Sequence, residues 1–198
     1  LPRLSIGDVT RAVMRWSVAG SMVIEMVVIA VQAARGRMSH FNTQTWFDSV
    51  QWRVMMVAVV VLSAAMLGIA IVASARPFAA SPLVAITTRI ALWLFMLSTV
   101  SGFAMGGRGR HSVGGGDGGG GLPFLDWSTR FGDLRISHFF ALHAIQLLPV
   151  AGAVLASALR HDAIGPAVAW SVALAFVAAY AGIVVWTLAR AFAGQPPW

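Results

Sequence analysis

An acidic residue interrupts the middle of a long apolar run near the start of the chain. Glu25 is the one charged residue of the run Trp16–Ala34 and lies about nine residues from either end. Such a run is long enough to cross about 30 Å of hydrocarbon, and a carboxylate near its centre must then face protein or water. On a helix with about 3.6 residues per turn, Gln32 lies two turns away on nearly the same face. The spacing therefore predicts a polar stripe on an otherwise apolar helix.

A second polar face is predicted much later in the chain. His138, His143 and Gln146 occur in one apolar run, and successive steps of about 100° place them within about 140° of one another around a helix. This favours one broad helix face that carries all three side chains.

The two faces together predict a pocket formed by Glu25, Gln32, His143 and Gln146. If the two helices touch, Gln32 and His143 lie at shallow depth, and Glu25 and Gln146 lie about 12–14 Å down. The functional interpretation is a proton relay, or a pocket for a quinone-like, lipid-like or metal ligand. The structural interpretation is a hydrogen bond between Glu25 and a histidine or glutamine that fixes helix packing.

Four of the five histidines are predicted to lie at one side of the membrane. Imidazole is a ligand for zinc, copper and non-haem iron, so these histidines form a candidate metal site. No tight ligand spacing supports the site, because the two histidines that share a run are five residues apart and diverge around the helix. The candidate ligands are His40, His111, His138 and His143.

A glycine-rich segment is the longest connection in the chain. The loop Gly106–Ser137 contains a run, Gly114–Gly121, that is glycine throughout except for Asp117. The chain has no lysine and no Gly-Lys-Ser/Thr ending, so the run is not a nucleotide loop. We interpret it as a flexible connector, with anion binding or close contact to another subunit as the alternatives. Ser128 or Thr129, together with Asp133, is predicted to cap a short interfacial helix that leads into the next span.

Five apolar runs position all these residues. The chain is predicted to be an all-α, polytopic helical membrane protein with a single transmembrane domain over residues 1–198. A mixed, basic lead-in over residues 1–15, with Asp8 as a helix cap, precedes the first run. The predicted spans are Trp16–Ala34, Val54–Ala75, Leu83–Met105, His138–Leu159 and Ile164–Ala189.

Composition limits the classes of function. The chain has 58% hydrophobic and 11% charged residues, far from the soluble norm of about a quarter charged. Its net charge of +7 comes from arginines placed singly at the ends of apolar runs, which indicates interfacial anchoring and not binding to nucleic acid. With no cysteine, disulfides, iron–sulfur clusters and cysteine nucleophiles are excluded. Arginine counts in the short loops favour a cytoplasmic N-terminus and a periplasmic glycine-rich loop.

Three motifs carry a resemblance to a known group of proteins. They are QAARGRMSHFN (Gln32–Asn42), HSVGGGDGGGGLP (His111–Pro123) and WSTRFGDLRISHFFALHAIQLLP (Trp127–Pro149). The chain resembles a family of uncharacterised polytopic bacterial integral membrane proteins. The resemblance implies a helical membrane fold in the bacterial inner membrane and brings no established activity, cofactor or catalytic residue.

The sequence favours a non-catalytic membrane component that binds a lipophilic or small ligand, or joins a larger assembly of membrane subunits, through this polar face. Alanine and glycine suited to close helix contact support it, as does the lack of a recognisable nucleophile or cofactor motif. Two alternatives stay open: a membrane oxidoreductase or metal-dependent enzyme that uses the four histidines with Glu25, and a proton-coupled transporter in which Glu25 titrates. Membrane lipids are expected partners in every case, and the sequence does not identify a cofactor.

Overall fold

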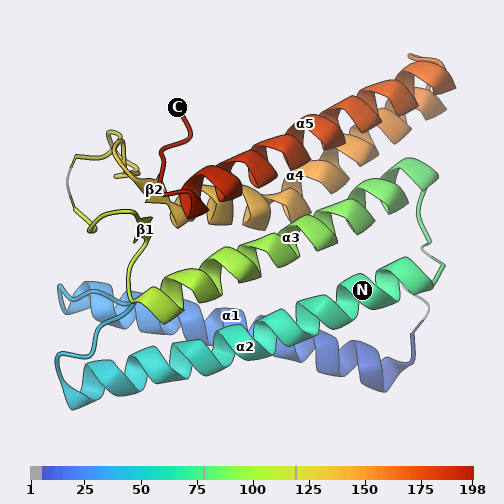
Figure 1. Cartoon of the computed structure of the whole chain (residues 1–198). Helices are drawn as coiled ribbons and strands as arrows, with labels where there is room; N and C mark the ends of the chain where they lie inside the picture. Colours follow the sequence, from blue (N-terminus) through green and yellow to red (C-terminus); the bar gives the residue numbers. More distant parts are fainter. Residues whose placement is uncertain (1–5, 78, 119) are drawn as a thin grey trace. The chain divides into compact units, whose positions relative to one another are not determined.

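The residues that the structure describes form five long helices, as the apolar runs predict. The computed structural model describes residues 6–77, 79–118 and 120–198, and every α-helix of this part is long and apolar enough to span a membrane (Figure 1). The chain is therefore an all-α, multi-pass membrane protein. The helices are α1 (Asp8–Ala34), α2 (Trp46–Ala75), α3 (Pro82–Arg108), α4 (Leu134–Arg160) and α5 (Pro166–Phe192).

Each helix is longer than the apolar run inside it. The helices have 27 residues, or 30 in α2, so they measure about 40–45 Å and exceed the hydrocarbon thickness of about 30 Å. The ends of a membrane helix continue through the headgroup region, where polar and aromatic side chains are tolerated. For this reason α1 begins at Asp8 and α2 at Trp46, well before the predicted spans.

The described part of the predicted lead-in is mostly helix. Residues 1–5 of it lie outside the described part of the chain, and α1 accounts for the rest from Asp8 onward. Asp8 is not the cap, which is Gly7; its carboxylate instead accepts a hydrogen bond from Arg11 at 3.0 Å. At the other end, Gly36 adopts a φ of 63°, which explains the glycine directly after the C-cap residue Arg35.

The chain divides into two compact units, each described by itself. Unit 1 (Leu1–Phe78) contains the antiparallel hairpin of α1 and α2. Unit 2 (Ala79–Trp198) contains α3, α4 and α5, together with two short strands, β1 (Ser112–Val113) and β2 (Gly132–Asp133), which pair antiparallel. The strands and the glycine-rich loop lie beside the C-terminal end of α5 (Figure 1).

Small residues let the helices of unit 2 pack closely. Ala91, Ala141 and Ala144 belong to its buried core. A Cβ added at Gly152 of α4 would lie 2.3 Å from the Thr87 hydroxyl of α3, so these helices meet where no larger side chain fits. This is the close contact that small residues permit between membrane helices.

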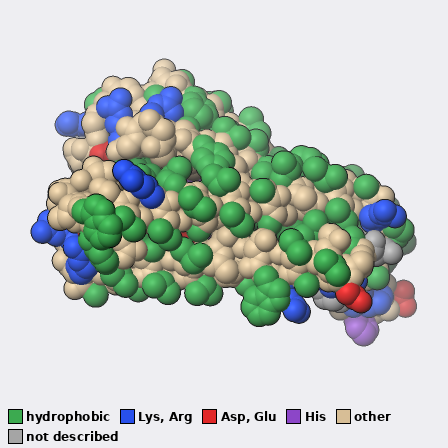
Figure 2. Space-filling view, turned by 90° about the horizontal axis from the view of Figure 1, so that it is seen from below, with side chains coloured by type: hydrophobic (Ala, Val, Ile, Leu, Met, Phe, Trp, Pro, Cys, Tyr) green, Lys and Arg blue, Asp and Glu red, His purple; other side chains and the backbone are tan. Residues whose placement is uncertain are grey.

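The helical surface is suited to lipid. Large apolar side chains such as Val57, Val150 and Val185 are more than half exposed. In the space-filling view, apolar side chains cover much of the face shown, and most arginines lie toward its ends (Figure 2). An apolar surface with basic margins is what a bilayer with hydrated headgroups on both sides requires.

Candidate functional site

Two carboxylates fold the glycine-rich loop of unit 2. The carboxylate of Asp117 accepts hydrogen bonds from the backbone N–H groups of His111 at 2.9 Å and Ser112 at 2.8 Å. Ser112 then pairs with Asp133 in the β1–β2 ladder, and an isolated bridge joins Gly121 to Ser128. The described part of this loop is therefore held at several points along its length.

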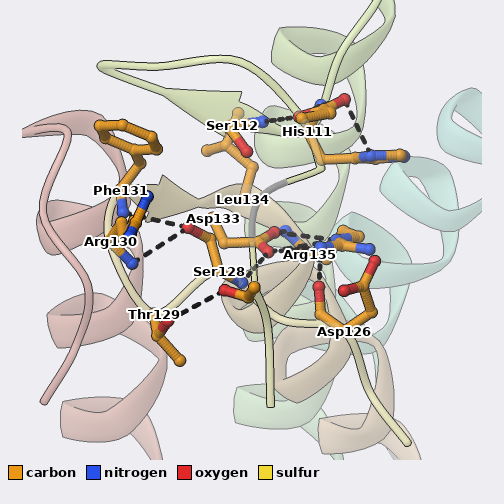
Figure 3. Close-up of polar contacts among 12 residues, drawn as sticks. His111, Ser112, Asp126, Ser128, Thr129, Arg130, Phe131, Asp133, Leu134 and Arg135 are labelled. Carbon is orange, nitrogen blue, oxygen red and sulfur yellow. Dashed lines mark hydrogen bonds and ion pairs between the residues drawn. The ribbon is translucent and has the colours of Figure 1, made fainter. Parts of the chain in front are cut away.

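Asp133 is the central acceptor of this loop (Figure 3). It is buried, and its carboxylate accepts from the backbone N–H groups of Ser128 at 2.9 Å and Arg135 at 3.0 Å. The Arg135 guanidinium pairs with the same carboxylate at 2.7 Å and donates to the carbonyl of Asp126 at 2.5 Å. Nε of Arg135, at 3.0 Å, is the fourth donor to this carboxylate. A buried carboxylate with four donors around it is satisfied, and its bond to the Arg135 N–H caps α4.

The prediction of a short helix before α4 is only partly right. Asp133 is a cap, as predicted, but it caps α4 itself. Ser128 instead accepts from the N–H groups of Arg130 and Phe131 in a turn, and the described residues between β1 and β2 contain no helix. The serine hydroxyl satisfies a turn as readily as a helix end, which is why its sequence position misleads.

Close contacts seat the loop on the end of α5. A Cβ added at Gly132 would lie 2.1 Å from the carbonyl oxygen of Ala191. Gly114, with a φ of 89°, packs against the backbone of Gly194 in the same region. Gly132 is required by this close approach and Gly114 is favoured by its positive φ, so the segment predicted to be a flexible connector is a folded cap on unit 2. Gly119 of the glycine run lies outside the described residues.

His111 and Asp117 form a titratable pair at the edge of this cap. Nδ1 of His111 lies 3.2 Å from the Asp117 carboxylate. Burial lowers the pKa of His111 below its usual 6.5, with a further lowering by the positive charge of Arg135, and the nearby carboxylates only partly offset this. Burial alone would raise the pKa of Asp117, but the N–H donors of His111 and Ser112 outweigh it and lower that pKa.

His138 joins two helices. Its Nδ1 lies 2.8 Å from the Ser98 carbonyl oxygen and 3.2 Å from the Ser101 hydroxyl, both on α3. Because a carbonyl only accepts, Nδ1 carries the proton and donates it to α3. A Cβ on Gly102 would lie 3.2 Å from this imidazole, so the glycine makes room for the ring. His138 thus fixes the α3–α4 contact.

His143 and Gln146 lie on the outer face of α4. Nδ1 of His143 donates to the Phe139 carbonyl at 2.7 Å, and the imidazole packs against the Phe139 ring with centroids 4.1 Å apart and the rings tilted by 34°. Trp127 packs edge-on against Phe139 at 5.6 Å. Gln146, one turn further along, is exposed and has no hydrogen-bond partner within the described part of the chain. The face therefore presents an imidazole and a free carboxamide beside an aromatic cluster.

Gln32 closes the hairpin of unit 1. It is fully buried, its Nε2 donates to the Asp48 carboxylate at 3.0 Å, and its Oε1 accepts from Arg35. Asp48 is fully buried as well, pairs with Arg35 at 2.6 Å and accepts from the Thr45 hydroxyl at 2.7 Å. Both ends of the Gln32 amide are used inside this network, so Gln32 has a structural role here.

Glu25 shares a helix face with Gln32, as the sequence predicts. The buried residues of α1 are Ser21, Val28 and Gln32, which together with Glu25 repeat at spacings of three and four. Glu25 is half-buried and has no hydrogen-bond or ion-pair partner among the residues that the structure describes. Glu25 and Gln32 belong to unit 1 and the other two pocket residues to unit 2, so the four-residue pocket stays a prediction.

The candidate metal ligands each have a local contact. His40 lies in unit 1, with Nδ1 2.9 Å from the Ser39 hydroxyl, whereas His111, His138 and His143 lie in unit 2. In the described ranges, no three histidine or carboxylate side chains lie close enough together to hold a metal ion. The metal site stays a prediction and gains no support from this arrangement.

The sequence identifies neither Asp48 nor Asp133, the acceptors at the centre of the two networks, as a site residue. Asp48 follows Thr45 by three residues, a spacing typical of a helix start, and each bonds the other there. Asp133 directly precedes a long apolar run, the usual place for a cap. These signals identify helix ends but not the partners that come from elsewhere in the chain.

Comparison with known proteins adds no relative: no family model, no curated protein and no solved structure matches the chain.

Proposed function

We propose that this membrane protein is a non-catalytic component that binds a lipophilic ligand with a hydroxylated, quinol-type head group on the outer face of α4. We further propose that it belongs to the family of bacterial polytopic membrane proteins that its motifs resemble, and that it resides in the inner membrane. The observation that carries the proposal is the orientation of His143, whose Nδ1 is committed to the Phe139 carbonyl at 2.7 Å.

This orientation defines what His143 can bind. With Nδ1 as the donor, Nε2 of the neutral ring carries a lone pair and accepts hydrogen bonds. His143 lies nine residues after the start of α4, about 13 Å along the helix and inside the hydrocarbon region. Acyl chains have no hydroxyl to offer, so an acceptor at this depth is satisfied only by a ligand or a partner that donates.

Gln146 extends the same site. It lies one turn from His143 on the same face, and its exposed carboxamide offers both a donor and an acceptor. An exposed amide within a membrane span carries a cost that a bound polar group removes. A head group with a hydroxyl for His143 and a second oxygen for Gln146 satisfies both side chains.

Aromatic side chains favour a flat head group. The rings of Phe139 and Phe140 lie 5.6 Å apart, edge to face, and Trp127 packs against both. Aromatic rings pair favourably in stacked or edge-to-face geometry, by about 0.5–1.5 kcal/mol beyond the area that they bury. A quinol head combines a flat ring with hydroxyl donors, and its apolar tail suits the lipid-facing surface of α4.

The experiment compares two short-chain probes on protein in nanodiscs: a benzoquinol and its dimethyl ether. Binding is followed by quenching of tryptophan fluorescence. Loss of one hydrogen bond costs about 1–1.5 kcal/mol, so we expect His143→Phe to weaken quinol binding about tenfold. His161→Phe, beyond the opposite end of α4, is the matched control and should bind as the wild type does.

The ether separates the hydrogen bond from simple partitioning into lipid. We expect the wild-type protein to bind the dimethyl ether about as weakly as His143→Phe binds the quinol. Equal affinity of quinol and ether for the wild type would refute the proposed role of His143. Absence of saturable binding by any probe would refute the lipophilic-ligand function as a whole.

A further inference from the structure

A groove runs between the two helices of unit 1. Its volume is about 450 Å³, within the range of about 300–1,000 Å³ that is usual for ligand sites. Its walls are mainly apolar, with a single charged side chain. Residues that line it include Trp16, Gly20, Ile24, Arg53, Val57 and Val61.

The dimensions of the groove match one extended hydrocarbon chain better than an α-helix. On each helix the lining residues extend over nine positions, Trp16 to Ile24 and Arg53 to Val61, and the eight steps between the first and the last measure about 12 Å along the axis. The volume spread over this length gives a cross-section of about 40 Å², about half that of a helix 10 Å across. The length is close to one leaflet, half of about 30 Å.

Glycine leaves the groove open. A Cβ added at Gly20 would meet no atom within 4 Å, although this residue lines the groove. Ser21 and Ala58 add further small side chains to the lining. The hollow therefore comes from missing side-chain volume on both helices, and a Cβ at position 20 has open space around it.

Arg53 marks the headgroup end of the groove. It follows Trp52, whose ring packs against Phe41 at 5.1 Å and His40 at 5.9 Å in an interfacial aromatic cluster. In the described residues, Arg53 has no carboxylate or hydrogen-bond partner, and the nearby acid Asp48 is occupied by Arg35 at 2.6 Å. An arginine at this level reaches toward the interface and is complementary to a phosphate.

We infer that this groove binds one acyl chain of an anionic phospholipid, whose phosphate pairs with Arg53. The apolar walls take the chain, the length covers most of one leaflet, and the unpaired guanidinium provides the preference for negative charge. The site lies in unit 1, so it is independent of the ligand proposed for α4.

The test measures lipid binding to delipidated protein by native mass spectrometry, with phosphatidylglycerol and phosphatidylcholine as probes. An arginine near the membrane surface contributes a preference of about fivefold for anionic lipid, which Arg53→Gln should remove. Gly20→Leu should weaken binding of both lipids about tenfold by filling the groove. Arg37→Gln removes an exposed arginine, bonded to Gln44 at 2.9 Å, from the same end of unit 1 and should leave both values unchanged.

Each outcome decides the proposal. Equal binding of the two lipids by the wild type overturns it, as does a preference that Arg53→Gln retains or Arg37→Gln also removes. Unchanged binding in Gly20→Leu overturns the groove as the chain site. A dimer that Gly20→Leu dissociates assigns the groove to a second copy of the chain and also overturns it. Val57→Phe fills the groove from α2 and repeats the test if Gly20→Leu does not fold.

Discussion

Replacing Asp133 by asparagine tests whether the glycine-rich loop is a folded cap. The substitution keeps the size of the side chain but removes its charge, and turns one acceptor oxygen into a donor. The new amide nitrogen can no longer accept hydrogen bonds from Ser128 or Arg135. In the wild type these two residues bond the Asp133 carboxylate at 2.9 Å and 2.7 Å.

The expected loss follows from burial. The side chain of Asp133 is fully buried and that of Arg135 is 29% exposed, so solvent screens the pair only weakly. Hydrogen bonds to charged groups contribute about 1.5–3 kcal/mol each, and breaking a buried pair costs about 3–5 kcal/mol. Because the asparagine keeps one acceptor oxygen, we expect about 3 kcal/mol, or about 150-fold in the opening equilibrium of the cap.

Hydrogen exchange measured by mass spectrometry in nanodiscs reads this opening directly. We expect the amides of Ser128 and Arg135 to exchange about 150-fold faster in Asp133→Asn. Asp126→Asn is the matched control, because Asp126 contributes its backbone carbonyl, which asparagine retains, to Arg135. Unchanged exchange in Asp133→Asn, or an equal increase in the control, would refute the reasoning.

Three further perturbations test other parts of the fold. Burial lowers the pKa of His111, so its contribution to cap stability is complete above the usual pKa of about 6.5 and is lost as the pH falls through the lower, folded pKa. Exchange in the cap should therefore rise on acidification in the wild type and rise less in His111→Gln; identical pH profiles would contradict this. Gln32→Leu removes a donor to Asp48 and should lower the free energy of unfolding by about 1–2 kcal/mol, seen as a lower thermal midpoint in mild detergent. Gly132→Ala places a Cβ about where the Ala191 carbonyl lies, 2.1 Å away, and should destabilise the cap by about 1–3 kcal/mol; proteolysis of the loop at the wild-type rate would show that the contact is not needed.

The membrane helices were predictable because lipid imposes a simple rule. Every backbone group within the hydrocarbon must bond inside its own helix, and apolar side chains must cover it, so length and hydropathy are sufficient signals. Hydropathy predicts later starts for α1 and α2 than the structure shows, because both helices continue into the interface, where Asp8 and Trp46 are tolerated. Hydropathy therefore locates the part of a helix that lies in the hydrocarbon region, and it does not locate the residue at which the helix begins.

The cap was not predictable, because it depends on contacts between distant residues. Composition shows that glycine permits many conformations, and it does not show that Gly132 must approach Ala191, which lies 59 positions later. Nor does it show that one carboxylate, Asp133, takes donors from both sides of itself. A run of glycine suggests a flexible backbone. Here, however, particular glycines are required because another part of the backbone lies too close for a side chain.

The polar residues of the helices fall into two groups, those with a hydrogen-bond partner on another helix and those without one. Gln32 and His138 each bond a group on another helix, in the α1–α2 hairpin and across α3 and α4, so removal of either is expected to loosen helix packing. Glu25 and Gln146, and Arg53 at the headgroup end of the unit 1 groove, have no such partner in the described ranges of the chain. Because a polar group inside a bilayer is retained only at a cost, the second group is where ligands are to be sought. Variants of the first group should therefore change stability before binding, and variants of the second should change binding before stability.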